Sequence, residues 1–303
     1  MTQIKSEITI AVVGDVHDLW EQEDRQALQH LGVDLVLFVG DFGNESVEIV
    51  EKIAAVTTPK AVIMGNHDAW YSASSWGRQK APYDQSTEDR VQQQLDLLGE
   101  AHVGFDKLDF HQFALSVVGS RPFSWGGSVW RNSQFYRDRY GIKSFEESTQ
   151  QIVNSAQDAT EDTLIFISHN GPYGLGNKTE SICGRDWKLE GGDYGDPDLT
   201  EAIAITKSLG KSVPFVTFGH MHHELKHPRG KRRQIVAVKE QTVYLNAACV
   251  PRITKSSQGK NRSFSLVKLY QGIVQTISLV WLDQDFAIQS DEVLYQAHNT
   301  LGK

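Results

Sequence analysis

The sequence predicts an α/β fold, and two observations carry that prediction. Three short apolar runs, at residues 8–13, 33–39 and 60–64, alternate with two segments of helical periodicity, at 23–31 and 45–56. A strand–helix–strand–helix–strand order of this kind builds a sheet that begins parallel or mixed. The composition is that of an ordinary globular protein, since 40% of the 303 residues are hydrophobic and 22% are charged.

The first half of the chain supplies clear element boundaries. The first helical segment, Glu23 to Leu31, places its apolar residues on one face and ends at Gly32. The second runs from Glu45 to Val56, and Asn44 is its expected N-cap. These boundaries leave the three apolar runs as strands.

The second half continues the alternation less regularly. Ser86 or Thr87 is the expected cap of a helix that runs through Leu98, and Gln271-Gly272 is the expected turn of a hairpin. The further expected strands are 113–118, 163–167, 213–218, 243–249 and 264–282, and the further expected helices are 145–156 and 199–209. No internal repeat or linker divides the chain, so we expect a single domain over residues 1–303. Within it, 69–112 and 171–198 are candidate substrate-shaping insertions and 283–303 is a peripheral tail.

The net charge of the chain limits the classes of partner that it can bind. The chain has 30 basic and 38 acidic residues, a net charge of −8, which argues against a general affinity for nucleic acid or an anionic membrane. A small anionic substrate stays open, because a bound cation inverts the local field. The two cysteines, Cys183 and Cys249, lack metal-site spacing and fit a reduced compartment. No apolar signal core or membrane-spanning run is present, so we expect a cytoplasmic protein; its oligomeric state is left open.

Polar side chains follow five of the predicted strands. In order along the chain they are Asp15 and His17, then Asp41, then Asn66, His67 and Asp68, then His169, then His220 and His222. Ligands of open α/β sheets bind outside the carboxyl ends of the strands, so these side chains can converge although they span more than 200 positions. Gly65 is expected to let the backbone bend before Asn66. Each motif alone also fits a polar turn or a helix cap. Five such motifs, each directly after a predicted strand, indicate one shared site.

The residue types indicate metal-dependent chemistry. Carboxylates, one amide and imidazoles without a thiolate suit Mn, Fe, Zn or Mg, and there are enough donors for two ions. Two metals roughly 3.5–4 Å apart can clamp an in-line displacement at phosphorus and make a bridging hydroxide available near neutral pH. Asp41 is the candidate bridging carboxylate. His67 is the candidate general acid for the leaving alkoxide, with Asp68 as the residue that orients its imidazole.

These residues resemble the motifs of the calcineurin-like metallophosphoesterase superfamily. The similar motifs are Gly14-Asp15-Val16-His17, Gly40-Asp41, Gly65-Asn66-His67-Asp68, His169 and Gly219-His220-Met221-His222, in that order over residues 8–282. The resemblance implies a four-layer αββα sandwich. In it, two mixed β-sheets are flanked by helices, and a dinuclear metal site lies at the carboxyl ends of the strands.

The resemblance also implies a ligand set for two divalent or trivalent ions. One metal would take Asp15, His17, Asp41 and His222, and the other would take Asp41, Asn66, His169 and His220. His67 would be the acid near the leaving group and would pair with Asp68. Manganese is the first choice of metal, with iron, zinc or magnesium as alternatives.

Departures from the motifs of protein Ser/Thr phosphatases narrow the class. The second motif continues as Phe42-Gly43-Asn44 where those enzymes carry Asp-Arg-Gly, and the third motif ends in Asp68 where they carry Glu. The closing Gly-His-x-His resembles the phosphodiesterase-type branch. We therefore expect hydrolysis of a phosphomono- or phosphodiester of a small molecule or nucleotide. The alternatives are a phosphoprotein phosphatase and a catalytically silent binding scaffold.

Three segments that the metal site does not require are candidates for substrate recognition. They are residues 70–83, 121–127 and 171–197, and the candidate substrate-binding residues in them are Arg121, Trp70 and Trp125. Aromatic faces and an arginine suit an organic leaving group and phosphate oxygens. His223 and His227 are expected at the surface, and the stretch 227–239 is expected to be an exposed basic loop.

Overall fold

The computed structural model describes residues 4–257 and 259–297 and contains two β-sheets packed face to face. In the first sheet the strand order is β13-β12-β11-β1-β2-β3, and β10 pairs with β11. Its strands are β1 (Glu7–Val13), β2 (Leu35–Phe38), β3 (Lys60–Val62), β10 (Ile253–Ser256), β11 (Gly259–Tyr270), β12 (Ile273–Leu282) and β13 (Ile288–Gln296). The pairs β1–β2 and β2–β3 are parallel and the others antiparallel, so the sheet is mixed.

The second sheet is also mixed, with the strand order β4-β5-β6-β7-β9-β8. Its strands are β4 (Lys107–Phe110), β5 (Leu115–Gly119), β6 (Thr163–Ile167), β7 (Ser212–Phe218), β8 (Val236–Lys239) and β9 (Thr242–Asn246). The four central strands are parallel, and the edge strands β4 and β8 pair antiparallel with their neighbours.

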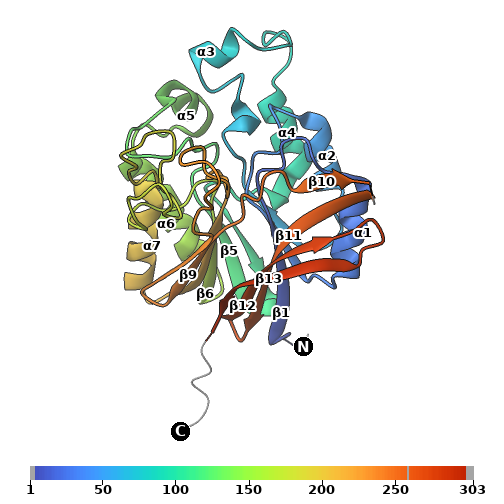
Figure 1. Ribbon diagram of the computed structural model, residues 1–303. Helices are drawn as coiled ribbons and strands as arrows, with labels where there is room; N and C mark the ends of the chain where they lie inside the picture. The colour runs from blue at the N-terminus through green and yellow to red at the C-terminus, as the bar shows by residue number, and fades with distance from the viewer. Residues whose placement is uncertain (1–3, 258, 298–303) are drawn as a thin grey trace.

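Helices cover the outer face of each sheet (Figure 1). Helices α1, α2 and α4 lie over the first sheet, α6 and α7 lie over the second, and α3 and α5 lie at the end of the molecule opposite the chain termini. The bounds are α1 (Gln22–His30), α2 (Val47–Ala54), α3 (Ser75–Arg78), α4 (Arg90–Leu98), α5 (Ser133–Tyr140), α6 (Phe145–Asp158) and α7 (Pro197–Ser208). The predicted four-layer αββα sandwich is therefore confirmed.

The continuous apolar runs of the central strands follow from this layering. In β1, Ile10 and Val12 face the core between the two sheets, whereas Ala11 and Val13 face the core beneath α1 and α2. A third core lies between the second sheet and helices α6 and α7. A strand buried on both faces needs apolar residues at every position, and this produces an unbroken run where a half-exposed strand would alternate.

Two expected helix caps were wrong. Ser46 occupies the N-cap position of α2, and the side chain of Asn44 has another partner, described below. The cap of α4 is Asp89, whose carboxylate accepts the amide of Gln92, rather than Ser86 or Thr87.

Edge strands account for two further differences. The stretch 227–239, expected as a loop, ends in β8, and the expected tail contributes β13 to the edge of the first sheet. The largely exposed pattern of β13 carries no buried face that a sequence could reveal. Residues 298–303 of that tail lie outside the described part of the chain. Within the described residues, no helix is both long and apolar enough to span a membrane.

Candidate metal centre

The loops that follow five strands bring the predicted ligands together. These loops leave the carboxyl ends of β1, β2, β3, β6 and β7, which lie at one edge of the two sheets. Three groups of side chains have ligand atoms within 4.8 Å of one another: Asp15, His17 and His222; His17, Asp41 and His67; and Asp41, His169 and His220. Asp41 and His17 each belong to two of the groups, so the groups form one continuous centre.

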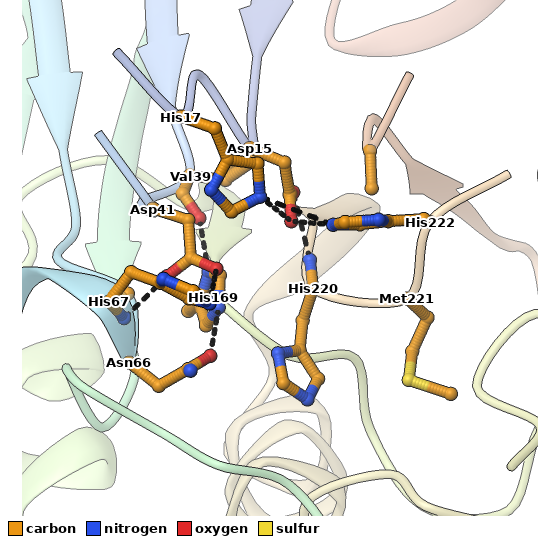
Figure 2. Close-up of polar contacts among 12 residues, drawn as sticks. Asp15, His17, Val39, Asp41, Asn66, His67, His169, His220, Met221 and His222 are labelled. Atoms are coloured by element: carbon orange, nitrogen blue, oxygen red, sulfur yellow. Dashed lines mark hydrogen bonds and ion pairs between the residues drawn. The ribbon is translucent and has the colours of Figure 1, made fainter. Parts of the chain in front are cut away.

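The first part of the centre gathers Asp15, His17 and His222 (Figure 2). The Nε2 atoms of His17 and His222 lie 3.2 Å apart, and His222 Nε2 lies 3.4 Å from Asp15 Oδ1. The other oxygen of Asp15 accepts the backbone amide of His220 at 2.9 Å. Asp15 therefore fixes the loop that carries His220 and His222 while its Oδ1 faces the two imidazoles.

The second part gathers Asp41, Asn66 and His169 (Figure 2). His169 Nε2 lies 2.9 Å from Asn66 Oδ1 and 3.2 Å from Asp41 Oδ1. His169 Nδ1 lies 2.8 Å from the carbonyl oxygen of Val39, which can only accept, so Nδ1 carries the proton. In the neutral ring this leaves the Nε2 lone pair directed at the centre, as a metal-binding imidazole requires.

The backbone is strained where it turns into the centre. Asp15, His17, Asp41 and His220 have positive φ angles of 50°, 44°, 56° and 66°. A residue with a Cβ pays of order 1–3 kcal/mol for this left-handed conformation, and such residues cluster at functional sites. These four residues lie in the loops directly after the core strands, where the chain turns toward the centre.

Two glycines provide room for the ligand carboxylates. A Cβ on Gly65 would lie 2.3 Å from Asp41 Oδ1, and a Cβ on Gly219 would lie 2.2 Å from Asp15 Oδ2. The expectation that Gly65 serves a backbone bend needs correction, because its φ is not among the positive ones. Glycine is required there because the carboxylate of Asp41 occupies the space of a side chain.

Electrostatics couple the buried groups. Burial raises the pKa of Asp41, but His169, followed by His67 and His17, outweighs it and holds that pKa well below its usual range. Burial likewise raises the pKa of Asp15, and His222 outweighs it, so the pKa is lowered. Burial lowers the pKa of His169, but Asp41 raises it to about 9. Both carboxylates are therefore anionic at neutral pH.

The residues fit a pair of metal ions. Asp15 Oδ1 is buried, accepts no hydrogen bond from the described residues and faces His222 Nε2 at 3.4 Å, so a cation bound there would offset the cost of burying its charge. Two imidazole nitrogens point at one another beside it, where two protonated rings would repel. Carboxylate, amide and imidazole donors without thiolate match Mn, Fe, Zn or Mg. The ligand assignment implied by the resemblance stays a prediction that this arrangement supports.

His67 lies at the rim of the centre with its ring fixed on two sides. Its Nε2 is 3.9 Å from Asp41 Oδ2, and its Nδ1 is 2.6 Å from Asn44 Oδ1. The ring stacks on Trp70 with centroids 4.5 Å apart and planes at 18°. The partner of His67 is thus Asn44, which sequence reasoning took for a helix cap. The sequence did place Asn44 three residues after Asp41, in the same loop, and this position was the signal that Asn44 could lie near the centre.

The expected pairing of Asp68 with His67 is wrong. The Asp68 carboxylate accepts the backbone amides of Asp41 at 3.0 Å, Phe42 at 2.8 Å and Gly65 at 2.6 Å. Asp68 is fully buried beneath the centre. Its three hydrogen bonds tie the loop that carries Asp41 to the loop that begins at Gly65.

Arg121, expected to bind substrate, lies in the interior. It is 4% exposed, and its guanidinium donates to Asp198 at 2.7 Å and to Asp196 at 3.0 Å. Asp196 also accepts the hydroxyl of Ser124 at 2.6 Å. This buried network joins the loop after β5 to the start of α7, so Arg121 is a structural residue.

A cleft of about 430 Å³ opens over the centre and contains two of the three predicted substrate residues. Trp70 and Trp125 line it together with Trp187 and Tyr194 from the second predicted insertion. The expectation that His223 lies at the surface is wrong: it is 4% exposed, and its Nε2 lies 2.9 Å from the carbonyl oxygen of Asn246. A larger cavity, of about 700 Å³, lies between residues 72–92 and helix α5, away from the ligands.

Comparison with solved structures indicates the fold. One crystal structure has a TM-score of 0.54 at 11% identity, with 91% of this chain and 99% of that chain covered. A dimetal phosphatase from Danio rerio has a TM-score of 0.47 at 11% identity, covering 96% of this chain and 99% of that chain. A Thermus thermophilus protein has a TM-score of 0.47 at 12% identity, covering 95% and 99%.

Comparison with sequences identifies the family. No curated protein gives a significant match. The family model described as calcineurin-like phosphoesterase matches residues 8–224, well over half of the chain, and this stretch contains every residue of the centre. The chain therefore belongs to the calcineurin-like phosphoesterase family.

Proposed function

We propose that the protein is a metal-dependent hydrolase that cleaves a phosphomono- or phosphodiester of a small molecule or nucleotide. The observation that carries this proposal is the convergence of carboxylate and imidazole side chains from five loops, one of which is the buried Asp15 with an oxygen that accepts no hydrogen bond from the described residues. Membership of the phosphoesterase family supports the reaction class.

Two ions fit the donor set. Asp15, His17 and His222 would hold one, Asn66, His169 and His220 would hold the other, and Asp41 would be shared between them. Bound ions would neutralise phosphate oxygens and lower the pKa of a bound water, which makes a nucleophile available near neutral pH. We place manganese first among the candidate metals.

His67 is the proposed general acid. Its Nδ1 is engaged by Asn44, so its Nε2 is the atom that can donate a proton to the leaving oxygen at the centre. Burial, followed by its neighbours His17 and His169, opposes the charge of Asp41 and lowers the pKa of His67. A lower pKa makes the protonated imidazole a stronger acid toward a leaving alkoxide. Stacking on Trp70 keeps the ring in this orientation.

The shape of the cleft favours a small ester over a phosphoprotein. Its volume of about 430 Å³ falls in the range of small-molecule sites. Aromatic side chains from all three segments expected to recognise substrate line it, which suits an organic alcohol group.

Hydrolysis of bis-p-nitrophenyl phosphate and of p-nitrophenyl phosphate tests the proposal. The protein is stripped of metal and refilled with Mn, Fe, Zn or Mg, with His67→Ala and Leu189→Ala measured in parallel; Leu189 is 86% exposed and serves as the control. We expect metal-restored turnover that His67→Ala lowers and Leu189→Ala does not. Absence of turnover with every metal would contradict the proposal and favour a binding scaffold.

A further inference from the structure

The cleft over the centre has aromatic walls, and one of its rings is more exposed to solvent than the others. Trp70, Trp125, Trp187 and Tyr194 line the cleft in the described structure. Trp187 is 42% exposed, whereas the other three are only partly exposed. An exposed indole at a cleft offers a flat apolar face, and covering that face with a ligand would be favourable.

The remaining rings are already engaged with protein groups. Trp70 stacks on His67 at 4.5 Å and on Trp125 at 5.4 Å, with interplanar angles of 18° and 21°. Tyr194 lies parallel to the ring of His220 at 6.5 Å. Trp187 has a single ring contact among the described residues, an edge-on approach to Tyr194 at 4.6 Å. Its indole is therefore the ring available for stacking with a ligand.

A buried ion pair ties the loop that carries Trp187 to the loop that carries the proposed metal ligands His220 and His222. The preceding residue, Asp186, is 5% exposed, pairs with Arg233 at 3.2 Å and accepts the amide of Lys226 at 2.8 Å. Arg233 in turn donates to the carbonyl oxygen of His222 at 3.0 Å. The loop that carries Trp187 is thus tied to the loop that carries His220 and His222, and its indole has a defined place beside them.

We propose that Trp187 is the specificity-determining residue of the cleft, and that it selects phosphoesters whose alcohol carries a flat aromatic ring of nucleobase size. The ring would stack on the indole while the phosphoester group lies at the donor cluster. This inference rests on the proposed function for the position of the ester, and on the aromatic geometry for the rest. Stacking of a base on an aromatic side chain is sequence-tolerant, so the inference names a flat ring rather than a particular base.

The test compares two ligands that share a phosphate and differ in the ring. Adenosine 5′-monophosphate and ribose 5-phosphate are titrated calorimetrically into metal-free and manganese-loaded protein, up to millimolar concentration. The variants are Trp187→Ala, Trp187→Phe and, as the matched control in the same loop, Leu189→Ala. We expect wild type to prefer the adenosine ligand, Trp187→Ala to lose on the order of 10- to 100-fold in affinity for it alone, and Trp187→Phe to recover part of the loss.

Three results would overturn the inference: equal affinity for both ligands, a ring preference that survives Trp187→Ala, or no binding of the adenosine ligand in either metal state. Because binding to the metal-free protein is measured without turnover, its outcome is separate from that of the proposed function. A ring preference that depends on Trp187, in a protein that hydrolyses no ester, would uphold the binding site and contradict the hydrolase.

Discussion

Replacing Arg121 by methionine should destabilise the fold and leave the affinity for substrate nearly unchanged. The guanidinium is 4% exposed and pairs with two buried carboxylates, on Asp198 at 2.7 Å and on Asp196 at 3.0 Å. Methionine fills most of the volume but provides no charge, so two buried carboxylates lose their counterion. Removing one partner of a buried ion pair typically costs about 3–5 kcal/mol.

The expected shift in melting temperature follows from the length of the chain. An unfolding entropy of about 2.1 cal/mol/K per residue over 303 residues gives about 0.6 kcal/mol/K, so the variant should melt about 5–8 °C below wild type. Calorimetry measures this shift, and the KM for p-nitrophenyl phosphate is measured beside it.

The deficit should also depend on pH. Burial already raises the pKa of Asp196 to about 6 even with Arg121 present. Without Arg121 the folded-state pKa of this carboxyl rises further above its unfolded value of about 3.9. A carboxyl group whose pKa is higher in the folded state than in the unfolded state lowers the stability of the fold at pH values above the unfolded pKa. This loss disappears when the pH is low enough for the group to bind a proton in both states. The difference from wild type should therefore be smaller at pH 5 than at pH 8.

A neutralised network is the control for Arg121. Adding Asp196→Asn and Asp198→Asn to Arg121→Met removes the unpaired charges and should restore most of the lost stability. An Arg121→Met variant with unchanged melting temperature and a KM raised tenfold would refute the structural role and would indicate that Arg121 binds the substrate.

Three further predictions concern the centre itself. His67→Ala should lower kcat roughly 10²–10⁴-fold. Asn44→Ala should lower kcat in the wild-type background and should cause no further loss in the His67→Ala background. Additive losses in this double-mutant cycle would rule out coupling between the two residues. Asp68→Asn, which removes an acceptor of backbone amides, should weaken metal binding about 10–100-fold in a calorimetric titration, and unaltered affinity would speak against the bracing role. Manganese at about 100 times its Kd should stabilise wild type by about 2.7 kcal/mol for each ion bound, so two ions should raise the melting temperature by about 8 °C, and Asp41→Asn should abolish most of the rise. An equal rise in that variant would place the metal elsewhere.

Sequence periodicity was sufficient for the centre of the fold because its strands are buried on both faces. β1, β2, β6 and β7 each read as a nearly continuous apolar run, and the polar residues that follow each run are the ones that meet at the sheet edge. The hairpin at Gln271-Gly272 was also predicted, since both residues have the positive φ angles such a turn requires. The edge strands β4, β8 and β13 lack a continuous buried face and escaped prediction.

The errors within the site have a common physical origin. Asp68 was paired with its sequence neighbour, yet its partners include amides 26 and 27 residues away. Arg121 was assigned to substrate because an arginine at a strand end suits phosphate, but its carboxylate partners lie 75 and 77 residues along the chain. Local sequence indicates which loop a side chain leaves, whereas its partner depends on which other loops the fold brings alongside.

The number of metal ions that bind per chain tests the central claim most directly. Metal-stripped protein is titrated with manganese, the bound metal is counted by elemental analysis, and His222→Ala and His169→Ala are measured beside wild type. The account predicts two ions for wild type and one for each variant, because these histidines lie in separate donor groups: His222 with Asp15 and His17, and His169 with Asp41 and His220. A single ion in wild type, or two ions in both variants, would contradict a dinuclear centre built from these residues.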